Sequence, residues 1–331
     1  MMSKLNLTLG CWNYDRTARL ANGTVRPDGI DLNYLEMPVE ETFFRMLRHR
    51  EFDVAEMSLS SYAVTCMHEP APFIAIPVFP SRYFRHSSIF IHTRSGIREP
   101  KDLIGKRVGS PEYQMTAPVW IRGILQDHYG VPVDSVTHVT GGEETPGRSE
   151  KVKLDLPPNI RIERIAPHET LSQMLAEGAI DALVTARNPS TFRTRPDRVA
   201  RLFPDFVDVE RAYFRSTGIF PIMHTIVIKR ETYEANRWIA QSLMKAFVEA
   251  QKATYRDLGE SAALKAMLPW LTSHVEEVIA EMGEDFWPYG LEKNRNTIDT
   301  FLRYHHEQGL SKSRLKVDEL FAAETSEGFV I

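Results

Sequence analysis

The order of apolar strands and amphipathic helices along the chain constrains the fold more than any other feature. Residues 4–9 alternate polar and apolar side chains, as half-buried strands do, and residues 31–36 repeat the pattern. Residues 40–50 place Phe43, Phe44 and Leu47 on one face of a predicted helix. Strands that alternate with helices indicate an α/β sheet. Further strands are predicted at 52–57, 73–79 and 88–92, and a further helix at 59–68.

A second α/β unit begins near residue 96 and is inserted into the first. Residues 143–159 are rich in Glu, Lys, Pro and Gly and are expected to form an exposed excursion from it. Residues 219–229 form an apolar strand that returns the chain to the first unit, and helices follow. We therefore expect a ligand cleft between two lobes, one built from residues 1–95 and 216–331 and the other from residues 96–215.

Composition and the N-terminal sequence exclude several classes of protein. The 331 residues include 40 basic and 44 acidic side chains, so no overall basic field attracts nucleic acid. Two cysteines exclude a framework of several disulfides. The sequence has neither the apolar run of a secretory signal nor the roughly 18 apolar residues of a membrane span. We expect a cytoplasmic protein with no nucleic-acid or membrane partner, and the helical C-terminal tail leaves a homo-oligomer open.

Polar and aromatic side chains gather just after the predicted strands, where ligands of α/β sheets bind. Arginine binds carboxylates, hydroxyls and helix starts bind anions, and aromatic rings suit a planar ligand. We therefore expect a small aromatic acid with more than one carboxylate. The alternatives are that the arginines are solvated and that the serines only cap a helix. The residues predicted to bind the acid are Tyr14, Arg16, Ser60, Ser61, Arg82, Tyr83, Arg85, Tyr113, Gln114, Thr116 and Arg187.

The sequence lacks the short motifs of several chemistries. It has no H-E-x-x-H, no C-x-x-C and no EF-hand loop, which are the usual metal-binding patterns. It also has no G-x-G-x-x-G, Walker loop or G-x-S-x-G elbow, which disfavours nucleotide binding and serine hydrolysis. We predict no cofactor and no metal. A divalent metal is left open, because Asp15, His86, Glu112 and His224 could converge in space.

Stretches covering essentially the whole chain resemble the 4,5-dihydroxyphthalate decarboxylase family. The most specific are FPSRYFRHSSI at 79–89 and PEYQMTA at 111–117. DLIGKRVG at 102–109 is less specific, since it also resembles many solute-binding proteins of ABC transporters. The resemblance implies a type II periplasmic-binding-protein-like fold with two lobes, a hinge and a cleft. It also implies conversion of 4,5-dihydroxyphthalate to protocatechuate and CO₂.

That reaction needs two proton transfers, because direct loss of CO₂ from a benzene ring would leave an unstable aryl anion. Instead, a base removes the proton of the hydroxyl para to the departing carboxylate, and an acid protonates the ring carbon that bears this carboxylate. Each transfer contributes about 10²–10⁴-fold to the rate. Histidine titrates near neutral pH, so we assign the two transfers to His86 and His224, with Glu112 and Asp15 as further candidates.

Two other functions stay open at this point. The first is a solute-binding protein or sensor for a small aromatic acid, which the same arginines and serines would suit. The second is another lyase on the same fold, of the kind found in the futalosine route to menaquinone.

Overall fold

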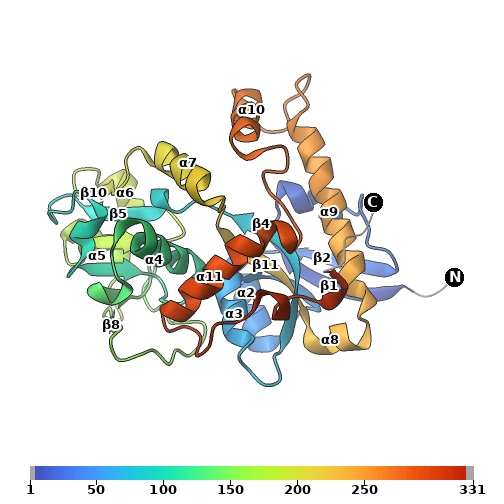
Figure 1. The fold of residues 1–331 in the computed structure, drawn as a ribbon, viewed down its shortest axis with the longest axis horizontal. Helices are drawn as coiled ribbons and strands as arrows, with labels where there is room; N and C mark the ends of the chain where they lie inside the picture. Colours follow the sequence, from blue (N-terminus) through green and yellow to red (C-terminus); the bar gives the residue numbers. More distant parts are fainter. Residues whose placement is uncertain (1–3, 326–331) are drawn as a thin grey trace.

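The computed structural model describes residues 4–325 and shows two α/β lobes side by side (Figure 1). The first lobe is built on a five-stranded sheet with the order β2-β1-β3-β11-β4. β1 is parallel to β2 and β3, whereas β11 is antiparallel to β3 and β4. The strands are β1 (Leu5–Cys11), β2 (Ile30–Glu36), β3 (Val54–Ser58), β4 (Phe73–Arg82) and β11 (Ile222–Lys229).

The second lobe is built on a six-stranded sheet with the order β10-β5-β9-β6-β7-β8. β6 is parallel to β7 and β9, and β5 is antiparallel to β9 and β10. The strands are β5 (Ile89–His92), β6 (Arg107–Ser110), β7 (Thr137–Thr140), β8 (Arg161–Arg164), β9 (Ala182–Val184) and β10 (Val199–Arg201).

The chain crosses from one lobe to the other and back. The first crossing lies between Arg82, where β4 ends, and Ile89, where β5 begins, and the second leads from α7 (Phe206–Thr217) to β11. The predicted boundary between residues 95 and 96 is therefore too late. The boundary was placed too late because the apolar sequence of β5 would suit a central strand of either sheet. The sequence pattern does not show which strands β5 pairs with.

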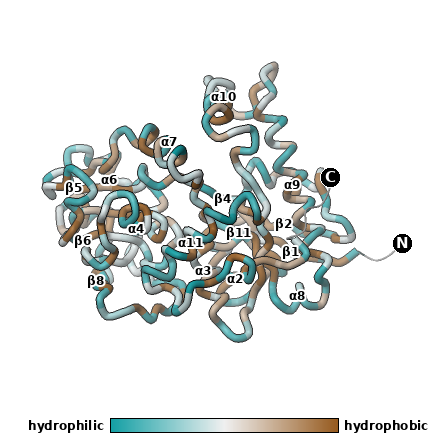
Figure 2. The backbone as a smooth tube through the Cα atoms, viewed as in Figure 1, coloured by the Kyte–Doolittle hydropathy of each residue, from teal (hydrophilic) through white to brown (hydrophobic). Residues whose placement is uncertain are grey.

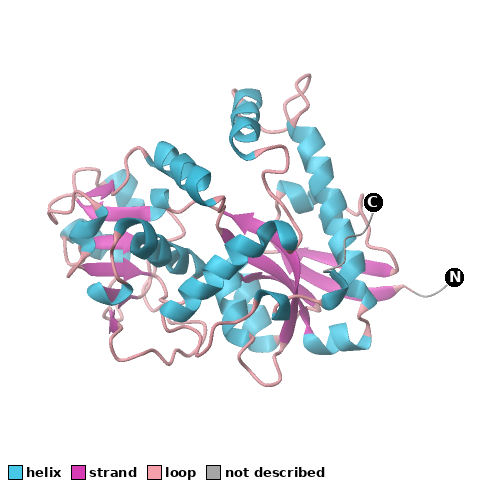
Figure 3. Ribbon diagram, in the orientation of Figure 1, coloured by secondary structure: helices cyan, strands magenta, loops and turns pink. Residues whose placement is uncertain are grey.

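Helices flank both sheets (Figure 3). The helices expected after residue 229 are present as α8 to α11, although residues 260–268, between α9 and α10, are not helical. Gly259 follows α9 and Pro269 precedes α10, and Met267 between them is fully exposed, so no core stabilises a helix there. The helices other than α7 are α1 (Ala18–Ala21), α2 (Val39–His49), α3 (Leu59–Thr65), α4 (Thr116–Tyr129), α5 (Leu171–Glu177), α6 (Ser190–Thr194), α8 (Arg230–Ala235), α9 (Trp238–Leu258), α10 (Leu271–Met282) and α11 (Arg295–Glu307).

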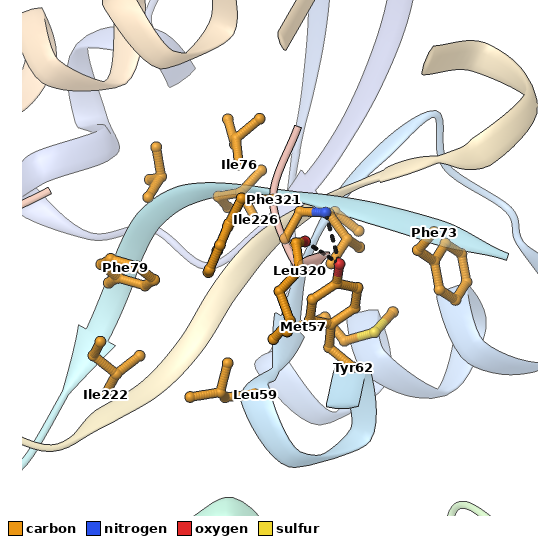
Figure 4. Packing of buried hydrophobic residues seen from close by; sticks show 14 of the residues in the cluster. Met57, Leu59, Tyr62, Phe73, Ile76, Phe79, Ile222, Ile226, Leu320 and Phe321 are labelled. Atoms are coloured by element: carbon orange, nitrogen blue, oxygen red, sulfur yellow. Dashed lines mark hydrogen bonds between the residues drawn. The ribbon is translucent and has the colours of Figure 1, made fainter. Parts of the chain in front are cut away.

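The strands of the first lobe cross a continuous apolar core (Figure 2). Tyr62 lies within this core, where its hydroxyl donates a hydrogen bond to the Leu320 carbonyl and accepts one from the Ala75 amide at 3.0 Å (Figure 4). These bonds satisfy a buried polar group and tie the C-terminal segment to β4. The consequence for the site is that β3, β4 and β11, which carry several of its residues, are held by dense packing.

No helix within residues 4–325 has the length and apolar character needed to cross a membrane. The cytoplasmic location and the homo-oligomer stay predictions.

Candidate active site

A cavity of about 420 Å³ lies between the two lobes. The volume suits a small aromatic ligand, and the lining combines aromatic rings, hydroxyls and cations. The polar lining residues are Tyr14, Glu40, Ser58, Ser81, Tyr83, Arg85, Gln114, Thr116, Lys151, Arg187 and His224. The apolar and aromatic ones are Trp12, Pro38, Val39, Phe43, Met115, Ala117, Ala186 and Met223. Of the eleven polar residues, seven were predicted from sequence: Tyr14, Tyr83, Arg85, Gln114, Thr116, Arg187 and His224.

His224 forms a dyad with Glu56, a residue that was not predicted. β11 pairs His224 with Ser58 of β3, and on its other side the pairing of β11 with β4 shifts register on both sides of His224. Glu56 lies two residues before Ser58 and therefore on the same face of β3. The His224 Nδ1 is 2.5 Å from Glu56 Oε1. Because Nδ1 is engaged in this contact, a proton exchanged with a ligand must pass through Nε2.

Glu56 is completely buried and accepts several hydrogen bonds. The Tyr14 hydroxyl donates to it at 2.6 Å and the Trp12 amide at 3.0 Å. Burial alone would raise the pKa of the Glu56 carboxyl, but His224 and these hydrogen bonds outweigh burial and keep this pKa below its usual range. One signal could have found Glu56, namely an acidic residue inside the apolar strand 52–57. A charge in a central strand must be paired, and such pairs often have a function.

Arg85 is a buried cation that faces the cavity. Its side chain contacts the sulfur of Met223 and the ring of Tyr83, with Nε 3.2 Å from Sδ and the guanidinium carbon 4.7 Å from the ring centroid. No carboxylate among residues 4–325 forms an ion pair with it. Burial lowers the pKa of Arg85 to about 10, which still leaves the guanidinium charged at neutral pH. A buried charge without a counter-ion is unfavourable, so an anionic ligand here would be stabilised.

His86 does not line the cavity, although it is next to Arg85 in sequence. It is 1% exposed and packs among the rings of Tyr129, Phe203 and Tyr213. Neither ring nitrogen has a hydrogen-bond partner in the described part of the chain, and burial lowers the pKa of His86 to about 4. Of the two histidines to which the sequence analysis assigned proton transfers, the structure therefore places His224 at the cavity and His86 away from it.

Arg82 is also outside the cavity and has a structural role. Its guanidinium donates to the carbonyls of Phe220 at 2.9 Å and Pro288 at 2.7 Å and to the Asn294 side chain. These contacts tie the end of β4 to the segment before β11 and to the C-terminal tail. The structure therefore does not place the predicted ligand-binding residue Arg82 at the cavity, because β4 directs its side chain into the first lobe.

Asp15 and Arg16 form an ion pair with each other at 2.9 Å and do not line the cavity. Arg16 lies against the rings of Tyr14 and Trp287, at 4.1 and 4.2 Å from their centroids. It therefore supports the site by packing on Tyr14 and by donating a hydrogen bond from Nε to the Pro80 carbonyl at 2.6 Å.

The remaining predicted residues lie just behind the cavity wall. The Ser60 amide donates to Thr116 Oγ1 at 3.0 Å, and the Ser61 hydroxyl donates to Gln114 Oε1 at 3.1 Å. Both serines therefore position residues that line the cavity. Tyr113 is buried and donates to the Gln308 carbonyl at 3.0 Å, which removes its hydroxyl from the ligand.

Glu112 is the centre of a buried ion cluster. It pairs with Lys151 and with Arg148, whose Nη2 is 2.6 Å from Glu112 Oε1. Burial alone would raise the pKa of Glu112, but the two cations outweigh it and lower this pKa. Residues 143–159 were expected to be exposed, yet this segment folds back and brings Lys151 to the cavity. The reason is that its cations find a carboxylate partner in the second lobe.

Replacing Glu112 with Gln is expected to destabilise the protein by about 3–5 kcal/mol at pH 7, because the buried Lys151 loses its carboxylate partner and Arg148 keeps only Glu40. The folded-state pKa of Glu112 is lowered, so its contribution is present above about pH 4.3 and is lost as pH falls through the folded value. Urea unfolding at pH 7 and pH 3.5 measures both effects. The difference in the free energy of unfolding between wild type and variant should be smaller at pH 3.5 than at pH 7. Glu163→Gln, which breaks an exposed pair with Arg107, is the control and should cost at most about 1 kcal/mol.

Within residues 4–325 there is no group of three or more His, Cys, Asp or Glu side chains that could bind a metal ion. Asp15, His86, Glu112 and His224 therefore do not converge, and that route to a metal site is removed.

The fold and the site together define a two-lobed binding-protein-like fold whose interlobe cavity is lined by the histidine of a Glu56–His224 pair. The periplasmic aliphatic sulphonate-binding protein SsuA of Escherichia coli shares the fold, with a TM-score of 0.53 at 14% identity over 98% of this chain and 99% of that one. A putative sulfonate-binding SsuA of Methylobacillus flagellatus gives 0.57 at 12% identity over 97% and 92%. At such identities the likeness shows the fold alone.

Sequence comparison identifies the family. The 4,5-dihydroxyphthalate decarboxylase of Comamonas testosteroni is 40% identical over the full length of both chains. That of Pseudomonas putida is 46% identical over 205 residues, which are 62% of this chain and 80% of that protein. No family model matches the sequence. The chain belongs to the 4,5-dihydroxyphthalate decarboxylase family.

Proposed function

We propose that this protein is a carboxy-lyase that converts 4,5-dihydroxyphthalate to protocatechuate and CO₂. The observation that supports this most is the Glu56–His224 dyad, which faces a cavity that also contains the buried cation Arg85. A cation recruits the carboxylate of the substrate, and a proton donor beside it reaches the ring carbon that carries this carboxylate. The two decarboxylases of the same family give the substrate.

His224 supplies the proton to the ring. The charged imidazole is stabilised by the Glu56 carboxylate, and its Nε2–H transfers the proton to the ring carbon bearing the departing carboxylate. Loss of the para hydroxyl proton gives a dienone, and the electrons of the bond to the carboxylate then restore the aromatic ring as CO₂ leaves. Each turnover consumes one proton, which His224 regains from solvent.

Arg85 binds a substrate carboxylate. It contacts Met223, the chain neighbour of His224, so carboxylate and proton donor meet at the same part of the cavity. Thr116 adds a hydroxyl and stands at the start of the 14-residue helix α4, where free amides favour an anion. Lys151 and Arg187 add positive charge from the second lobe.

Replacing Arg85 with Ala should raise KM, and the Kd for phthalate, by about 10- to 100-fold, since a charged hydrogen bond contributes about 1.5–3 kcal/mol. Arg85→Lys should recover part of this loss. Catechol, which has the hydroxyls but no carboxylates, is the matched ligand and should bind both variants as it binds wild type. Calorimetry with the two ligands measures this. If the binding of phthalate and of catechol weakened equally, the substitution would have disturbed the cavity in general and not a specific contact with a carboxylate.

The activity itself is tested by incubating the protein with 4,5-dihydroxyphthalate and measuring CO₂ and protocatechuate. A solute-binding protein would show a thermal shift with this compound but no turnover. A different lyase of this fold would bind the acid and leave both carboxylates in place.

A further inference from the structure

The proposed reaction also needs a group that accepts the phenolic proton, and His86 does not line the cavity. Among the described residues, Glu40 is the one carboxylate that lines the cavity, because Glu56 and Glu112 lie behind its wall. We infer that Glu40 is this acceptor and recognises the hydroxyls of the substrate. This inference rests on the proposed function and assigns a second catalytic residue to it.

The position of Glu40 relative to His224 suits two different parts of one ring. Glu40 and Phe43 are three residues apart in α2 and so share one face of the helix, about 4.5 Å apart along its axis. The Phe43 ring lies edge-on to the His224 imidazole, with the ring centroids 4.9 Å apart. Phe43 therefore separates the Glu40 carboxylate from the His224 imidazole along the cavity wall. With this spacing, Glu40 can contact the hydroxyls of a substrate while His224 contacts the end of the ring that carries the carboxylates.

Two arginines of the second lobe hold the Glu40 carboxylate. Arg148 Nη1 lies 3.2 and 3.1 Å from the two oxygens, and Arg187 Nη2 lies 3.7 Å from Oε1. Arg148 is itself fixed by the buried Glu112. The Glu40 side chain remains 34% exposed, so a ligand can reach it. The carboxylate is thus oriented by its two arginine partners and accessible to a ligand, as a proton acceptor has to be.

A carboxylate is a weak base, but the chemistry does not need a strong one. When His224 protonates the ring carbon, the ring withdraws electrons from the para hydroxyl, and that O–H bond becomes strongly acidic. The proton passes to Glu40, and the C–O bond becomes the dienone carbonyl. When CO₂ leaves, the electrons of the broken C–C bond return to the ring and to this oxygen, which takes the proton back from Glu40. The acceptor is therefore regenerated within each turnover.

Replacing Glu40 with Gln should lower kcat about 10²-fold at pH 7. The defect should fade with rising pH, because phenols ionise near pH 10 and an ionised substrate needs no acceptor. We expect the ratio of wild-type to variant kcat to narrow about tenfold between pH 7 and pH 9. Glu40→Asp should recover part of the activity. Glu41→Gln is the matched control, since Glu41 is the next residue of the same helix, is exposed and pairs with Arg45.

Glu40 also joins the lobes, so a purely structural role must be distinguished. Loss of an interlobe ion pair would lower kcat by the same factor at every pH, and a constant ratio would therefore overturn the inference. The Kd for catechol should rise in Glu40→Gln while that for phthalate stays within about threefold, and the reverse would also overturn it. If wild type itself releases no CO₂ from 4,5-dihydroxyphthalate, the proposed function fails, which is a separate result.

Discussion

His224→Gln is expected to lower kcat by about 10³- to 10⁴-fold, near the upper end of what one proton transfer contributes. The Gln side chain has about the same reach and can still hydrogen-bond Glu56, but it cannot carry a proton to the ring. His224 lies on β11 between two packed strands, so the substitution should leave the fold intact. The ring carbon then has to be protonated by water, which is not oriented by Glu56.

Steady-state kinetics with 4,5-dihydroxyphthalate measure this loss, and the Kd for phthalate should stay within about threefold of wild type. His86→Asn is the matched control, since His86 was also a catalytic candidate from the sequence but lies outside the cavity. Its kcat should remain within about threefold even where its stability is reduced. A His224→Gln variant that retains more than a tenth of wild-type kcat would remove His224 from the mechanism.

The contrast between these two histidines shows what the sequence can and cannot predict. The order of strands and helices was enough for the two-lobed α/β fold, because hydrophobic periodicity reports local structure directly. It also brought attention to the segment 79–89, where Arg82, Arg85 and His86 look alike as candidates. Which of them faces the cavity depends on how β4 ends and where the chain turns towards the second lobe. That information lies in long-range packing, and only Arg85 faces the ligand site.

The charged residues that were missed share a cause. Glu56 is hidden in an apolar strand, and its partner His224 is 168 residues away, so no spacing connects them. Lys151 and Arg148 lie in a segment whose polar composition predicts exposure to solvent. In the structure, both pair with the buried Glu112. In each case the deciding interaction is an ion pair between distant parts of the chain, which composition and periodicity do not encode.

Glu56→Gln should lower kcat by about 10³-fold although Glu56 is buried behind the cavity wall. The carboxylate is ionised, since the pKa of Glu56 is held below its usual range in spite of burial, and it both orients the imidazole and stabilises its charged form. An uncharged amide of the same shape no longer stabilises the charged imidazole and no longer fixes its tautomer. In other enzymes, the same change beside a catalytic histidine strongly lowers kcat.

A double-mutant cycle separates this role from a general loss of stability. If Glu56 acts through His224, the Glu56→Gln/His224→Gln protein should be no slower than His224→Gln alone, because the carboxylate has nothing left to orient. Independent effects would instead multiply to about 10⁶-fold or more. Glu56 also accepts a hydrogen bond from Tyr14, and Tyr14→Phe therefore serves as the control for disturbed packing around the carboxylate. That variant should lose less than about tenfold, because the ion pair between Glu56 and His224 remains, and a loss as large as that of Glu56→Gln would assign the effect to the hydroxyl instead.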